Sequence, residues 1–118
     1  MVIETNLHLG VGIVRGNVFL IRRHVQRIPP TVTLSSGKLT VKSALADTDA
    51  QAIFQKTATV EDSGTTGTCV FRFNLTAANT NALTADVFVY FDIQLTLSDG
   101  TILTQESGQF AARQKVTD

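Results

Sequence analysis

The sequence predicts an all-β protein, an antiparallel β-sandwich of about seven strands. Two long stretches alternate apolar with other residues at period two, which is the spacing of a strand with one buried face. Short strand-like runs elsewhere are separated by turn-forming residues, as in sandwiches. The chain has 118 residues, a length that fits one core. We therefore expect a single β-sandwich domain over residues 1–118.

The two alternating stretches predict the core strands. Between Cys69 and Leu75, and again between Val87 and Leu97, every odd position carries an apolar residue. A helix would scatter these residues around its circumference, whereas a strand places them all on one face. We therefore expect core strands over 69–75 and 87–97.

A hairpin is predicted directly after the second of these strands. The pair Asp99-Gly100 suits a tight turn between two strands, and a further strand-like run follows it. Gly108 stands late in that run, where it is interpreted as the mark of a β-bulge.

The first half of the chain predicts shorter strands. A β-rich run covers 17–25, and 31–45 is interpreted as two short strands around a turn at 36–37. Another strand is expected over 52–60, followed by a connection over 61–67.

One helical crossover is predicted near residues 76–83. Thr76 can cap a helical turn, because its hydroxyl accepts a hydrogen bond from a backbone N–H two or three residues later. Eight residues are too few for an independent helix. We expect a single capped turn, with Leu83 closing one end of the sandwich.

Composition and charge exclude several classes of protein. No apolar run reaches the length of about 18 residues that a membrane span needs, and the N-terminus has no signal-peptide pattern. One cysteine, Cys69, excludes an internal disulfide and a cysteine-based zinc site. Residues 1–60 carry a charge of 7 − 3 = +4 and residues 61–118 carry 3 − 7 = −4. This division favours head-to-tail contact between copies.

No constellation in the sequence predicts catalysis, a metal site or a cofactor. His8 and His24 have no second histidine at ligand spacing, and Cys69 alternates with core phenylalanines, as a buried hydrophobe does. The basic run 22–27 has no interleaved aromatic residues and alternates between strand faces, which does not favour nucleic-acid binding. A solvated sheet edge is expected there. We therefore expect a protein that is not an enzyme.

The candidate site is a protein interface. Phe88 and Tyr90 lie on the even face of the predicted 87–97 strand, opposite its core-facing residues. If this face is exposed, the two aromatics form an apolar patch suited to a partner protein. The alternative is that another sheet, loop or terminal segment covers them. Arg22 and Arg23 are secondary interface candidates.

Three segments in order resemble a phage family. They are "VRGNVF" (14–19), "FRFNLTAANTNAL" (71–83) and "VYFDIQLTLSDGTILTQESGQFAARQKVT" (89–117). Together they are similar to the immunoglobulin-like N-terminal domain of phage baseplate upper proteins and of related small tail-associated proteins.

The resemblance implies an immunoglobulin-like sandwich that acts by assembly within a virion, without catalysis. Its partners would be other virion proteins, further copies of itself, or both, without a membrane. It would be made in the bacterial host cytoplasm and end in the virion, at a tail, baseplate or fibre. The alternative is a module that binds carbohydrate or a host surface. Such modules usually present Trp or Tyr platforms, yet Trp is absent and Tyr90 is the only tyrosine.

Overall fold

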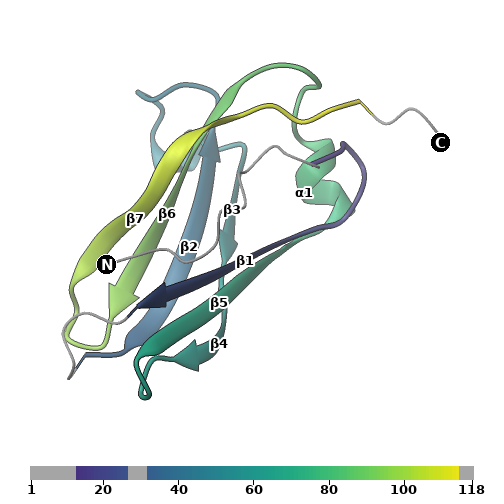
Figure 1. Ribbon diagram of the computed structural model, residues 1–118. Helices are drawn as coiled ribbons and strands as arrows, with labels where there is room; N and C mark the ends of the chain where they lie inside the picture. Colours follow the sequence, from purple (N-terminus) through teal and green to yellow (C-terminus); the bar gives the residue numbers. More distant parts are fainter. Residues whose placement is uncertain (1–12, 27–31, 115–118) are drawn as a thin grey trace.

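The computed structural model describes residues 13–26 and 32–114, which form two packed β-sheets (Figure 1). The strands are β1 (Phe19–Gln26), β2 (Leu34–Lys42), β3 (Phe54–Thr57), β4 (Thr59–Ser63), β5 (Thr68–Leu75), β6 (Val89–Leu97) and β7 (Ile102–Phe110). A 3₁₀ turn spans Asp49–Gln51, and α1 (Ala77–Asn81) connects β5 to β6.

The strand order is that of an immunoglobulin-like sandwich. One sheet has the order β1-β5-β4 and the other has the order β3-β2-β6-β7; all neighbours are antiparallel. These orders correspond to strands B-E-D and C′-C-F-G of the immunoglobulin arrangement. The predicted all-β class, the seven strands and the short helical crossover are confirmed for the described residues.

The core lies between the sheets, where alternation places the apolar residues. The odd positions of β5 and of β6 are buried, and they meet buried residues of β1 and β2. The rings of Phe71 and Phe73 pack edge to face, with centroids 5.8 Å apart. Burying one such side chain stabilises the fold by about 1.5–3 kcal/mol, so this layer holds the sheets together.

The expectation of two short strands around 36–37 was wrong, because β2 runs through this point as one strand. The pairing with β6 shifts between Leu34 and Ser36, so the irregularity is a bulge and not a turn. Gly37 then lies inside the strand. A Cβ atom there would lie 3.2 Å from the Cβ of Ala58 and 3.3 Å from Cδ2 of Leu95, so this glycine permits close packing.

The single strand expected over 52–60 was also wrong. The chain changes sheets at Ala58: β3 pairs with β2 in the four-stranded sheet, whereas β4 pairs with β5 in the other. The Ala58 N–H donates to the Gly37 carbonyl at 2.8 Å, which holds the crossing point against β2. A continuous run of β-forming residues does not indicate where the chain passes from one sheet to the other.

The hairpin between β6 and β7 is confirmed, but its bulge is not at Gly108. Leu97 N–H donates to the Thr101 carbonyl at 2.8 Å across the turn. In the β6–β7 ladder, Ile93 pairs with Glu106 while Gln94 pairs with Thr104, so the extra residue is Gln105. The bulge reverses which residues of β7 face inward, and Glu106 therefore points into the sandwich.

Gly108 has a different role from the one expected. It pairs with Phe91 in the ladder, and a Cβ atom at position 108 would lie 3.1 Å from a ring carbon of Phe91. The glycine leaves room for this ring, which packs against Phe110 with centroids 5.9 Å apart.

The crossover forms as predicted. Thr76 Oγ1 accepts a hydrogen bond from the Asn79 N–H at 3.2 Å, at the start of α1. Leu83, just after the helix, is buried in the core.

Candidate interface

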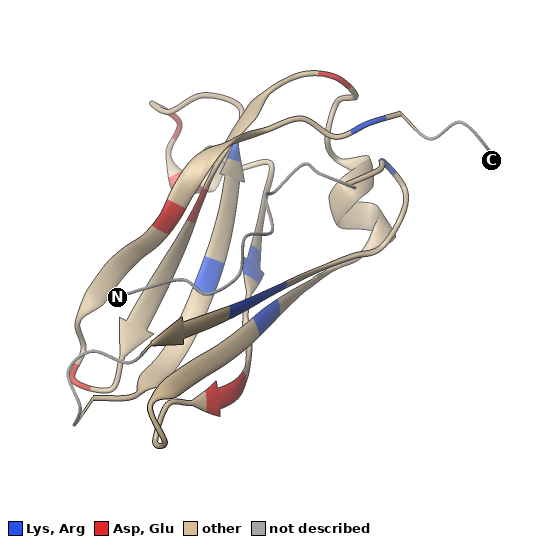
Figure 2. Cartoon of the chain, in the orientation of Figure 1, with Lys and Arg blue, Asp and Glu red and all other residues tan. Residues whose placement is uncertain are grey.

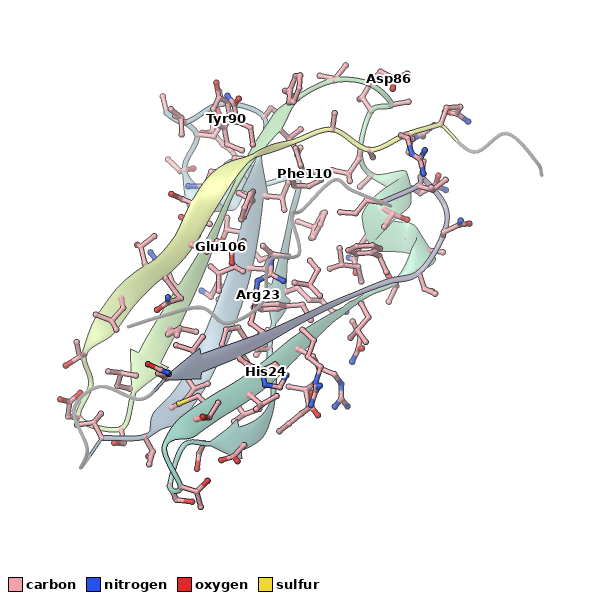
Figure 3. The ribbon with its side chains drawn as sticks, in the orientation of Figure 1. Arg23, His24, Asp86, Tyr90, Glu106 and Phe110 are labelled. Carbon is pink, nitrogen blue, oxygen red and sulfur yellow. The ribbon has the colours of Figure 1, made fainter. Side chains whose placement is uncertain are left out.

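The two aromatic residues singled out in the sequence lie where β6 begins. Phe88 immediately precedes the strand and is 67% exposed. Tyr90 is half-buried at an even position of β6, where side chains face away from the core. Figure 3 shows Tyr90 at the upper end of β6, beside the loop that follows β2. Both rings therefore have surface that a partner could contact.

Val87 was expected in the core but is 49% exposed. The reason is Asp86, whose φ of 59° turns the chain just before the strand. The Asp86 N–H donates to the Ala112 carbonyl at 2.8 Å, so the turn is tied to the segment after β7. Regular alternation starts only at Val89, and two successive apolar side chains face solvent.

Leu45 lies near Tyr90, although it comes from a distant part of the sequence. It lies in the loop after β2, is 77% exposed, and lines the same pocket as Tyr90. Sequence reasoning missed it, although an apolar residue inside a turn-rich stretch is itself a sign of surface contact. We call Leu45, Val87, Phe88 and Tyr90 the apolar patch.

A shallow pocket of about 110 Å³ adjoins the apolar patch on the outer face of the four-stranded sheet. Its lining residues come from three neighbouring strands and one loop: Thr40, Lys42, Leu45, Tyr90, Phe91, Asp92 and Ser107. Tyr90 lies opposite Lys42 in the ladder, and Asp92 lies between Thr40 and Ser107. The pocket thus combines one aromatic ring with charged and hydroxyl groups.

Partial burial raises the pKa of Asp92 above its ordinary value, because the charged form loses hydration there. The nearby Lys42 opposes this effect and the nearby Asp49 adds to it. Lys42 Nζ lies 3.1 Å from Asp49 Oδ1. Its positive charge is therefore shared between two carboxylates.

Arg23 is not at the surface, contrary to its designation as an interface candidate. Its side chain is 1% exposed, with Nε 2.8 Å from Glu106 Oε1 and Nη2 3.0 Å from Glu106 Oε2. Figure 3 shows the two side chains meeting between the sheets. Arg23 occupies the same inward face of β1 as Ile21 and Val25, where an arginine is tolerated because the carboxylate compensates its charge.

Arg22 faces the opposite way and is accessible. Its side chain forms two hydrogen bonds with Glu61, of 2.8 and 3.3 Å. These bonds lower the pKa of Glu61 and raise the pKa of Arg22. Among the described strands, β1 forms one edge of its sheet, so the basic run 22–27 begins on a sheet edge with alternating faces.

Two of the motif segments meet at the end of the sandwich that carries α1. Arg15 Nε donates to the Leu83 carbonyl at 2.6 Å, and Nη2 donates to the Asn81 carbonyl at 3.3 Å. Thr80 Oγ1, fully buried, donates to the Asn17 carbonyl at 2.7 Å. The segment before β1 therefore holds the C-terminal end of α1, and these motif residues have structural roles.

The cysteine and histidine residues considered in the sequence do not form a common site within the described residues. Cys69 is buried, and its Sγ donates to the Ser63 carbonyl at 3.4 Å. His24 lies half-buried on β1, and His8 lies outside the described residues. Within 13–26 and 32–114, no three His, Cys, Asp or Glu side chains group so as to hold a metal ion. Over the same residues, no helix has the length and apolar character to cross a bilayer.

No protein-family model matches the sequence, and no curated protein and no solved structure matches it significantly.

Proposed function

We propose that this chain is a non-catalytic structural protein of a phage or prophage particle, associated with its tail, baseplate or fibre, and that it acts by protein–protein assembly. The observation that carries the proposal is the exposure of two successive apolar residues, Val87 and Phe88, directly before β6. Leu45 and Tyr90 line one shallow pocket near the start of the same strand. A regular strand would bury one of two successive side chains. Here the backbone turn at Asp86 presents both to solvent.

The local backbone supports an interface role for the apolar patch. A non-glycine residue with positive φ costs free energy and persists only where surrounding contacts impose it. At Asp86 the hydrogen bond to Ala112 supplies that contact. The turn exposes Phe88 and Val87 at a cost in solvation, and docking of a partner would recover this cost.

The assignment to a phage particle rests on the family resemblance. The residues that carry it include Arg15, Thr80 and Leu83, which together fix the α1 crossover. A shared motif that stabilises a crossover of this sandwich is consistent with a shared fold. In this proposal the protein is made in the host cytoplasm and ends in the virion, bound to other virion proteins.

Particle composition tests the proposal. We expect mass spectrometry of particles purified from the strain that encodes this chain to find it in stoichiometric amounts. Phe88→Ser should lower its incorporation at least tenfold, because truncation of an aromatic hot spot costs about 2 kcal/mol or more of binding free energy and about 1.4 kcal/mol already corresponds to tenfold. Ile102→Ser is the matched control, since Ile102 is equally exposed but lies outside the apolar patch. Particles that lack the chain would refute the proposal.

A carbohydrate-binding module is the second candidate, and the pocket beside Tyr90 is the observation that favours it. An aromatic ring with Asp92, Lys42 and two hydroxyl groups matches the mixed apolar and polar lining of small-molecule sites. Its volume of about 110 Å³ falls below the range of about 300–1,000 Å³ common for ligand pockets, so this candidate ranks second. Specific glycan binding on an array, lost in Tyr90→Ala, would reverse the order.

A further inference from the structure

A second exposed apolar surface lies on the other layer of the sandwich, over β1 and β5. A groove of about 230 Å³ is lined by Val18, Phe19, Leu20, Asn74, Leu75 and Thr76. We call it the β1 groove. Val18 and Leu20 are exposed, and Leu20 pairs with Asn74 in the ladder. Because both members of this pair face outward, the groove opens to solvent and away from the four-stranded sheet.

The β1 groove has a basic border. The next outward-facing pair on the same two strands is Arg22 opposite Arg72, an arrangement in which like charges repel. One carboxylate, Glu61, serves both, at 2.8 Å from Arg22 Nε and 3.6 Å from Arg72 Nη1. These three side chains sum to 2 − 1 = +1. Figure 2 shows positive stretches side by side on β1 and β5.

The apolar patch has an acidic border. Negative stretches occupy the loop after β2 and the loop before β6 (Figure 2). The charged residues around the patch are Asp47, Asp49, Asp86 and Asp92, against Lys42 and Arg113, which follows the Ala112 paired with Ala85, and their formal charges sum to 2 − 4 = −2. The chain therefore carries two apolar surfaces of opposite charge, one on each layer.

We infer that the apolar patch of one copy docks in the β1 groove of a second copy. This inference rests on the proposed function and names one partner for the same patch. Phe88 fills the groove: a cavity of about 150 Å³ accepts benzene, and the groove measures about 230 Å³. The carboxylates around the patch then face Arg22 and Arg72, whose surplus charge they neutralise, and this complementarity sets the orientation of docking.

Such a contact joins two different surfaces, so a dimer formed by it still has a free groove on one copy and a free patch on the other. A heterologous contact of this kind generates rings when the rotation closes and filaments when it does not. Growth by addition of identical copies is the expected behaviour.

The test uses the full chain in sedimentation velocity over a range of concentrations. The mean mass should rise with concentration, and it should fall in about 1 M salt, where the Debye length is about 3 Å and charge attraction is screened. Phe88→Ser and Leu20→Ser should each weaken association at least about tenfold. Ile102→Ser, an exposed apolar residue outside both surfaces, should associate as the unmodified chain does. Circular dichroism melts establish that each variant is folded.

Mixing the two variants separates this contact from a symmetric one. Phe88→Ser keeps an intact groove and Leu20→Ser keeps an intact patch, so their mixture should form dimers that grow no further. Self-association of Leu20→Ser alone would overturn the inference, because it would indicate patch-to-patch pairing. A chain that stays monomeric at every attainable concentration would also overturn it. If particles still require Phe88 in that case, the proposed function stands and the partner is another virion protein.

Discussion

Arg23 Nε lies 2.8 Å from Glu106 Oε1, and this ion pair joins β1 of one sheet to β7 of the other across the interior. The bulge at Gln105 makes the contact possible, because it turns Glu106 inward from a strand whose earlier inward residue is Leu103. The burial of Arg23 on β1 therefore depends on the bulge in β7.

Removal of the carboxylate should destabilise the fold strongly. Glu106→Ala removes the carboxylate that forms the ion pair with the buried Arg23, and loss of one member of a buried pair costs about 3–5 kcal/mol. Arg23 also donates to the Arg22 carbonyl, so we expect the lower end of this range. Urea unfolding measures the change. Glu61→Ala removes the exposed carboxylate that Arg22 and Arg72 share, and its midpoint should fall much less than that of Glu106→Ala because water screens the exposed charges. Equal losses for both variants would contradict the role assigned to the buried pair.

Gly108→Ala should strain the sandwich where β7 pairs with the start of β6. The added methyl group would lie 3.1 Å from the ring of Phe91, and overpacking of this kind costs about 1–3 kcal/mol. Thermal unfolding measures the loss. In a Phe91→Leu background the same glycine change should cost less, because the ring that it meets is gone. Identical costs in both backgrounds would show that the contact is not the cause.

Thr80→Val should loosen the crossover while keeping the shape of the side chain. The substitution removes the hydrogen bond to the Asn17 carbonyl, and a buried group that loses its partner costs about 1–3 kcal/mol. Hydrogen exchange of the α1 amides should accelerate accordingly. Thr84→Val, at an exposed position after the helix, is the control and should leave exchange unchanged.

Asp92→Asn should make the protein more stable at neutral pH. The pKa of Asp92 is raised in the fold, chiefly by burial. The contribution of Asp92 to the free energy of unfolding is therefore fully present below its unfolded-state pKa of 3.8, and it is lost as the pH rises through the pKa of the folded protein. The two proteins should have equal free energies of unfolding near pH 3. At neutral pH the free energy of unfolding of the variant should be the higher one, by no more than the about 0.5 kcal/mol that is typical of surface changes. A variant that is less stable at neutral pH would mean that attraction to Lys42 outweighs burial.

Local sequence determined much of this architecture. The alternation from Cys69 to Leu75 places the odd-numbered residues on the buried face of β5. Asp99-Gly100 forms the turn of the hairpin. Thr76 caps α1 as its position predicts. Each of these features depends on residues within a few positions of one another, where backbone preferences and the strand period act directly.

Tertiary structure alone decided the features that depend on distant partners. Arg23 is buried because Glu106, 83 residues away, compensates its charge, whereas an isolated arginine in a strand pattern is expected to face solvent. Val87 and Phe88 are both exposed because Asp86 is tied to Ala112, and Leu45 comes near Tyr90 from another loop. A period-two pattern identifies which residues share a face, but the partners of that face are set by contacts between segments that the pattern does not encode.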